Sequence, residues 1–275
     1  MILTLVVIAI LVGATLTFFH LPYSKTKSKF HLLAEERLST SSPLEGVFTA
    51  SDWESLPPSV RTYFESSGFT GQPKMSSMKA EFRDVPFLLS GKSLTIDYTQ
   101  YNFLQPIERI AWIDTSLAGV PFEGLDTFLA GKGGMKGVLG KLFPLFDQHS
   151  QELDQASLVT YLSEVLLFPS AALESGIVWN PIDDTQVKAT LSAYGLSVSG
   201  WFQFREGGES VSFTTDDRYV VESDGTSRQV RWSALMDNFK VVDGIRQPTR
   251  MRAVWHEKSG DVVYFDSDNL TLHYR

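Results

Sequence analysis

The chain has 275 residues, enough for a large buried core, and its 24 basic against 32 acidic side chains give a formal net charge of −8. An acidic surface repels the phosphate backbone, so we expect no nucleic-acid partner. The absence of cysteine excludes disulfide bonds, thiolate metal sites and thiol catalysis, and it leaves the redox compartment open.

Residues 1–22 predict a membrane anchor. Residues 2–19 carry no charged side chain, and about 20 helical residues cross the hydrocarbon core of a bilayer. A cleaved signal peptide and a buried core helix are the alternatives. No Lys or Arg precedes the run, and residues 18–22 are too bulky for a cleavage site. We therefore expect residues 2–21 to contact the lipid bilayer as one transmembrane helix.

Two arguments about membrane orientation conflict. Lys25, Lys27 and Lys29 follow the apolar run, and the positive-inside rule then places the following domain in the cytoplasm. A short N-terminus before a single apolar run is also how many exported, anchored domains begin. We favour the outer, non-cytoplasmic side, partly because of the family resemblance described below.

Residues 23–46 are rich in Ser, Thr, Lys and Glu, and they predict a polar linker with one helical turn around residues 30–38. Residues 47–275 are expected to form a single β-rich globular domain. Its first element is a short helix with Pro58 in its first turn and with Val60, Tyr63 and Phe64 on one face.

Strand patterns begin at Met78, where apolar side chains alternate with polar ones, as they do in residues 94–99 and 187–193. Turn sequences separate such runs in the second half, so we expect seven or eight consecutive antiparallel strands between residues 187 and 274. These turn sequences are Glu206-Gly207-Gly208-Glu209, Asp224-Gly225, Asp243-Gly244 and Ser259-Gly260.

Two segments interrupt the strand pattern. The glycine-rich residues 131–140 place Gly133 after Lys132, where a phosphate-binding loop needs Ser or Thr, so a flexible, tightly turning connection is expected. Residues 151–168 have helical periodicity and end at Pro169. The predicted fold class is α+β: a curved, half-barrel-like antiparallel β-meander with a helix packed across it, preceded by one N-terminal transmembrane helix.

Four carboxylates lie beside aromatic residues in the sequence. Burial next to apolar bulk raises a carboxyl pKa and suits a general acid, whereas pairing with Arg83 or Arg109 is the commoner fate of a buried acid. No serine lies in a nucleophile elbow and the five histidines lack metal-binding spacing, so we expect no catalytic residue, no metal and no cofactor. The four carboxylates are Glu108, Asp114, Asp126 and Glu164.

Aromatic residues make up 12% of the chain, and two interpretations of them stay open. In the simpler one, they fill the core. In the other, a curved sheet with one helix across it leaves an apolar concavity that holds an acyl chain or a similar apolar small molecule. The candidate lining residues are Arg109, Trp112, Tyr161, Glu164, Phe168 and Trp179.

Four short blocks resemble a family of uncharacterised bacterial membrane-anchored proteins that carry a domain of unknown function. They are LPPSVRTYF (56–64), GKGGMKGVLG (131–140), VTYLSEVLLFPSAAL (159–173) and VWNPID (178–183). The resemblance covers about residues 53–275 and implies no activity. Thr160 stands where the family tends to have arginine, so it also implies no Arg–Glu pair on this helix. By strand order alone, the domain resembles the open half-barrels of bacterial lipoprotein carriers.

Three functional hypotheses follow. The first is a membrane-anchored, non-enzymatic envelope protein that binds an apolar or lipid-like ligand in a concave sheet. The second is an envelope enzyme in which Glu164 performs acid/base chemistry with Tyr161 or Arg109. The third is a structural or partner-binding envelope protein.

Overall fold

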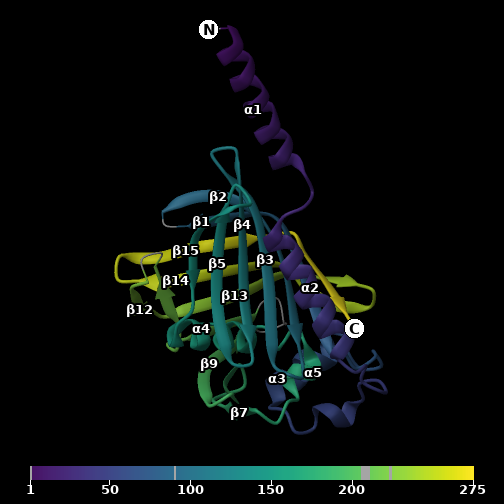
Figure 1. Cartoon of the computed structure of the whole chain (residues 1–275). Coiled ribbons are helices and arrows are strands. Elements are labelled where there is room, and N and C mark those ends of the chain that lie inside the picture. The colour runs from purple at the N-terminus through teal and green to yellow at the C-terminus, as the bar shows by residue number, and fades with distance from the viewer. Residues whose placement is uncertain (1, 90, 206–210, 223–224) are drawn as a thin grey trace.

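The computed structural model describes residues 2–89, 91–205, 211–222 and 225–275, and within these ranges one large curved antiparallel sheet dominates the domain (Figure 1). The helices are α1 (Ile2–His20), α2 (Lys25–Thr40), the 3₁₀ helix η1 (Ala50–Trp53), α3 (Pro58–Ser66), α4 (Gln151–Ser163) and α5 (Pro169–Ala172). The strands are β1 (Ser77–Leu89), β2 (Lys92–Phe103), β3 (Glu108–Leu117), β4 (Val120–Leu129), β5 (Lys132–Leu139), β6 (Phe143–Gln148), β7 (Ile177–Pro181), β8 (Gln186–Ala193), β9 (Leu196–Phe204), β10 (Val211–Thr215), β11 (Tyr219–Val221), β12 (Ser227–Gln229), β13 (Trp232–Val242), β14 (Ile245–Glu257), β15 (Gly260–Ser267) and β16 (Leu270–Tyr274).

The sheet consists of two meanders joined side by side. Strands β1–β6 neighbour one another in chain order, and so do β7–β10 with β13–β15. The two halves meet where β1 pairs with β15 and β16, so the last strands of the chain hold the first one in place. In Figure 1, β2–β5 run lengthwise while β13–β15 run almost crosswise to them. Strands β6 and β7 remain at the two ends, and the sheet is not closed.

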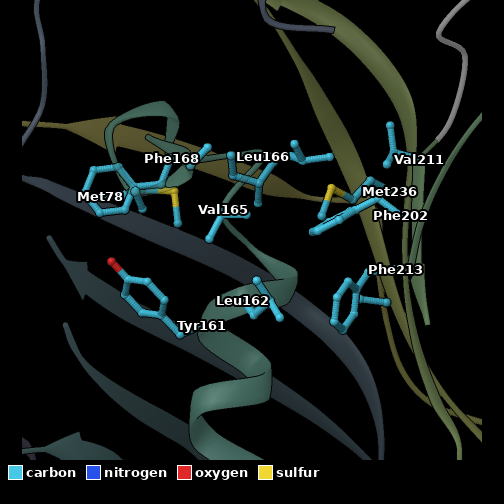
Figure 2. Packing of buried hydrophobic residues seen from close by; sticks show 14 of the residues in the cluster. Met78, Tyr161, Leu162, Val165, Leu166, Phe168, Phe202, Val211, Phe213 and Met236 are labelled. Carbon is cyan, nitrogen blue, oxygen red and sulfur yellow. The ribbon is translucent and has the colours of Figure 1, made fainter. Parts of the chain in front are cut away.

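Helix α4 lies on the inner face of this curved sheet. It contacts β3, β4 and β5 from one half and β8 and β9 from the other. Figure 2 shows Leu162 and Val165 lying between Met78 of β1 on one side and Phe202 and Phe213 on the other. A helix that is buried on nearly every side belongs to a core, and the core of this domain is built around α4. The predicted α+β fold class, with a curved antiparallel sheet, a helix packed across it and a long apolar N-terminal helix, is confirmed.

The central helix is shorter than the predicted span of residues 151–168. It ends at Ser163, and the backbone then turns tightly, with the Val165 N–H donating to Leu162 O at 3.4 Å and the Leu167 N–H donating to Glu164 O at 2.9 Å. Pro169 lies in the first turn of the separate helix α5 instead of ending α4. Glu164 consequently occupies the C-terminal end of α4, where its side chain leaves the helix toward the sheet.

Most of the glycine-rich run is a strand, so its prediction as a turning connection holds only at Gly131 and Gly140, which have positive φ in the turns that flank β5. Residues 132–139 form β5, and Gly133 allows α4 to approach the strand backbone, because a Cβ atom there would lie 2.3 Å from the carbonyl oxygen of Leu153. The Gly133 N–H donates to Oδ1 of Asp154 at 2.7 Å. The glycine thus permits close packing of the helix against the strand. The sequence analysis interpreted the same glycine as a sign of flexibility.

Helix α2 occupies much of the segment that was predicted as a polar linker with one helical turn. Ser24 caps its N-terminus, accepting from the Lys27 N–H at 3.0 Å. Phe30 and Ala34 are buried against Trp112 and other apolar side chains on the outer face of β3 and β4. The prediction of a single helical turn was wrong, because apolar residues spaced four apart give this charged segment a buried face.

The predicted turns follow the expected chemistry where the structure describes them. Asp243 and Gly244 both have positive φ, as a type I′ hairpin turn requires, and they join β13 to β14. Gly260, which also has positive φ, follows the turn between β14 and β15. The predicted turn at residues 206–209 lies outside the described residues, as does Asp224. Within the described part of residues 186–274 there are nine strands, one more than the upper prediction, and β11 and β12 form a small separate sheet.

Helix α1 extends away from the domain (Figure 1), and none of its residues is buried. It is long and apolar enough to span a membrane or to be a signal sequence.

Candidate functional site

A cavity of about 160 Å³ lies on the concave side of the sheet, between its two halves. Its size is comparable to that of an engineered apolar cavity that admits benzene, roughly 150 Å³. Strands β1–β5, helix α4 and strands β13–β15 all contribute to its wall, so it forms only because the two meanders meet.

One side of the cavity is apolar and mostly aromatic. Phe82 and Phe265 meet edge to face with their ring centres 5.2 Å apart, and Phe87 contacts both Tyr264 and Phe265 in the same way. Aromatic side chains present large rigid apolar surfaces, which suit contact with a hydrocarbon group. The apolar and aromatic residues of this wall are Phe82, Phe87, Trp232, Met251, Tyr264 and Phe265.

The opposite side is polar, and strand alternation explains which residues reach it. Successive side chains of a strand point to opposite faces, so Tyr98, Gln100 and Asn102 of β2 all point inward. In register, Asn102 lies opposite Arg109 of β3, and Asp126 of β4 lies beside them on the same inner face. Three neighbouring strands therefore place their polar side chains together under the end of α4.

Arg109 is the centre of a hydrogen-bond network. Its Nη1 donates to Oδ2 of Asp126 at 2.7 Å, and its Nη2 donates to the hydroxyl of Tyr98 at 2.7 Å and to Oε1 of Gln100 at 2.8 Å. Burial by itself lowers the pKa of Arg109, but Asp126, Tyr98 and Glu164 together outweigh this effect and raise it, so the guanidinium is charged. The network fixes this buried cation in one orientation.

Glu164 joins the network from the end of α4. Its Oε2 accepts from Nε2 of Gln100 at 2.6 Å and from Nδ2 of Asn102 at 2.7 Å, and only 8% of the residue is exposed. Burial raises the pKa of this carboxyl above its ordinary value, although Arg109 and the two amides act in the opposite direction. The side chain is a buried acid that is held rigidly at the edge of a cavity.

Arg218 reaches the cavity from the segment between β10 and β11. Its Nη1 donates to Oγ1 of Thr160 at 2.6 Å and to Ala156 O at 2.9 Å, and its guanidinium carbon lies 4.2 Å from the ring centre of Trp232. Within the described ranges no carboxylate oxygen lies within 4.0 Å of its nitrogens, although its charge lowers the pKa of Glu164, and its Nε is buried without a hydrogen-bond partner. The side chain is thus a stacked cation with unused hydrogen-bonding capacity at the cavity.

The structure places Arg109 and Glu164, of the six predicted lining residues, together at this cavity. Trp112 lies on the outer face of β3, with its ring centre 6.3 Å from that of Phe30 in α2. Tyr161 is buried and donates its hydroxyl to Phe103 O at 3.0 Å.

Phe168 and Trp179 lie away from the cavity. Phe168 is part of the apolar core, and the Nε1 of Trp179 donates to Ala172 O at 3.1 Å. Of the other carboxylates considered, Asp126 pairs with Arg109, whereas Glu108 pairs with Arg37 of α2. Among the described residues, no group of three or more His, Cys, Asp or Glu side chains could hold a metal ion.

Comparison with known proteins identifies the family. The model of a family of unknown function (DUF6544) matches residues 46–267. The chain belongs to this family. The resemblance predicted from the four sequence blocks is therefore confirmed, and the cavity residues named above fall inside the matched range.

A weaker similarity concerns the fold. A LolA superfamily protein from Nitrosomonas europaea, known from its crystal structure, is similar over 79% of this chain and 94% of its own, with 11% identity and a TM-score of 0.39. A search of curated proteins gave no match.

Sequence reasoning missed Gln100, Asn102 and Arg218. In a half-buried strand, polar residues are normally assigned to the solvent face, so Gln100 and Asn102 were not expected to point inward. Arg218 meets Thr160 across 58 residues of sequence, a contact that no local pattern predicts. The available signal was the pair of amide side chains two residues apart on one strand, which marks a polar inner face.

Glu164→Gln should alter how stability depends on pH. Because the folded-state pKa of Glu164 is raised above the ordinary value of 4.5, its contribution to stability is full below pH 4.5 and is lost as pH rises through the folded-state pKa. The glutamine keeps an acceptor for the two amides and cannot ionise. Urea unfolding at pH 4.5 and pH 7 measures this effect. The free energy of unfolding of the variant, relative to that of the wild type, should increase with pH by about 1.4 kcal/mol for each unit by which the folded-state pKa of Glu164 is raised. Equal differences at the two pH values would contradict this account.

Proposed function

We propose that the protein is held in a membrane by α1 and binds an apolar or lipid-like molecule in the cavity inside its curved sheet. The observation that carries the proposal is the cavity itself, with an aromatic wall on one side and a fixed polar network on the other. Binding sites for small molecules combine a mostly apolar lining with a few placed polar groups.

The anchor is supported by the length and composition of α1. Its 19 residues extend about 28 Å at 1.5 Å per residue, close to the thickness of the hydrocarbon core. None of them is buried against the domain, so apart from its last turn the apolar surface of the helix is exposed. We place the domain on the outer side of the membrane, and protease accessibility in intact cells tests this orientation.

The polar end of the cavity indicates the chemistry of the ligand. Arg218 is a cation stacked on Trp232 that forms no close ion pair in the described ranges, although its charge also acts on Glu164, and it lies at the end of an aromatic wall. A guanidinium in this position favours a ligand with an anionic group at one end, such as a carboxylate or a phosphate. An amphiphile with an apolar body and an anionic end matches both sides of the cavity.

Native mass spectrometry of the full chain, extracted in mild detergent and exposed to a total lipid extract, tests the proposal. We expect one or more bound amphiphiles at near-stoichiometric occupancy. Ala253→Phe places a ring in the cavity and should remove them, whereas Val263→Phe, at an exposed position of β15, is the matched control and should not. No bound species in the wild type, or equal retention by both variants, would overturn the proposal.

Acid/base catalysis by Glu164 is the second candidate. It is favoured by a buried carboxyl of raised pKa at the edge of the cavity. If the protein is an enzyme of this kind, Glu164→Gln abolishes a turnover found by substrate screening while the folded state is retained.

A further inference from the structure

The hairpin between β5 and β6 presents three large apolar side chains to solvent. Leu142, Phe143 and Leu145 are 57%, 66% and 54% exposed. Single exposed apolar residues are normal, but three within four positions, at the start of an edge strand, are a concentration that soluble proteins usually avoid.

This hairpin contacts the chain at the end of α1. Nζ of Lys141 donates to the carbonyl oxygen of Leu21, one residue beyond α1, and lies 5.9 Å from the ring centre of Phe18. The ring of Phe19 lies 3.5 Å from where a Cβ atom on Gly140 would stand. The hairpin that carries the exposed patch therefore contacts the chain at the point where α1 ends.

The chemistry around the patch suits the surface of a bilayer. Phe18, Phe19 and the exposed Tyr23 surround the end of α1, and aromatic side chains are enriched at the depth of lipid headgroups. Lys141 directly precedes Leu142, so a cation lies behind the apolar tip. Lysine in this position keeps its charged end at the headgroups while apolar neighbours enter the bilayer.

A second, smaller space lies between the β5–β6 region of the sheet and the cavity. A narrow apolar space of about 20 Å³ is lined by Phe122 and Phe146, near the β5–β6 hairpin, and by Phe87, Ile113 and Met135. The last three residues also line the main cavity. A path of apolar side chains shared by the two spaces thus connects Phe146 of β6 with the cavity.

We propose that the β5–β6 hairpin lies in the interface of the bilayer that holds α1, with Leu142, Phe143 and Leu145 in contact with lipid. The proposal rests on the membrane anchor of the proposed function. It makes the membrane the source of the ligand, because the apolar path begins in β6, the second strand of this hairpin.

The absence of native cysteine permits a direct test with single-cysteine variants of the full chain. Each variant is labelled with an environment-sensitive nitrobenzoxadiazole probe and reconstituted into vesicles of phosphatidylcholine and phosphatidylglycerol. Phe143→Cys reports the hairpin, Leu11→Cys reports α1, and Val241→Cys is the control. Val241 is an apolar residue that is 70% exposed on the β13–β14 hairpin. This hairpin contacts the end of α3, and α3 lies far from α1 in Figure 1.

The expected result is a blue-shifted emission for the Phe143 and Leu11 probes and loss of that emission when brominated phosphatidylcholine is included. The Val241 probe should emit as in water and remain unquenched. If the Leu11 probe is quenched and the Phe143 probe behaves like the control, the hairpin proposal is overturned and the anchor stands. If the Leu11 probe is also unquenched, both are overturned.

Discussion

Replacing Arg109 with methionine should lower the free energy of unfolding by about 3–5 kcal/mol, the usual effect of removing one partner of a buried ion pair. Methionine retains apolar volume but leaves Asp126 without the guanidinium that lies 2.7 Å away, and it removes the donor to Tyr98 and Gln100. Urea unfolding measures the change. For a domain of this size, the melting temperature should fall by roughly 6–20 °C.

Two further variants separate charge from packing in that experiment. Arg83→Met removes an exposed arginine that also pairs with a carboxylate, Asp97, and it should change stability by no more than about 1 kcal/mol. Asp126→Asn added to Arg109→Met should restore part of the loss, since it removes the partly buried charge that is left unpaired. If Arg109→Met were as mild as Arg83→Met, the network would not be a rigid part of the fold.

Arg218→Met should weaken the binding of dodecanoate by roughly 10- to 100-fold, because a hydrogen bond to a charged group contributes about 1.5–3 kcal/mol and each 1.4 kcal/mol is a factor of ten. Dodecanol has the same chain without the charge, and its binding should change little. The methionine side chain can still pack on Trp232, so the aromatic wall keeps its neighbour.

Competition against a bound fluorescent fatty acid measures both affinities on the full chain in detergent. Arg228→Met is the control, because Arg228 pairs with Glu257 at 2.6 Å on exposed β12, away from the cavity. Equal losses for dodecanoate and dodecanol would show that Arg218 supports the shape of the cavity and does not recognise charge.

Alternating patterns predicted the strands and the fold class because one side of most strands remains in contact with solvent. The pattern fails in β3, where all six residues from Glu108 to Ile113 are buried, since α2 covers the outer face and the cavity side is enclosed as well. Without visible alternation, Trp112 was grouped with Arg109. Residues three apart on a strand point to opposite faces, and the tryptophan consequently lies under α2.

The candidate site was predicted in part, for a related reason. Glu164 was conspicuous because it follows the helical spacing of buried aromatic residues, and Arg109 because it stood near carboxylates in the sequence. The cavity, however, is formed where β1 and β2 lie near β13–β15. No local sequence pattern predicts that strands from the beginning and the end of the domain pair with each other. Arg218 became a candidate only through this long-range contact.

The pairing of β1 with the C-terminal strands also has a consequence for biogenesis. Met78 is aligned with Tyr274, and Phe87 with Phe265, so the loop that must close spans nearly the whole domain. Closing so long a loop costs chain entropy before its contacts form, which slows folding. While the polypeptide is still being synthesised, β1 can pair with β2 but lacks β15 and β16, so the fold is completed only when translation is almost finished. An incompletely folded chain is also the form in which a segment can be threaded through a membrane.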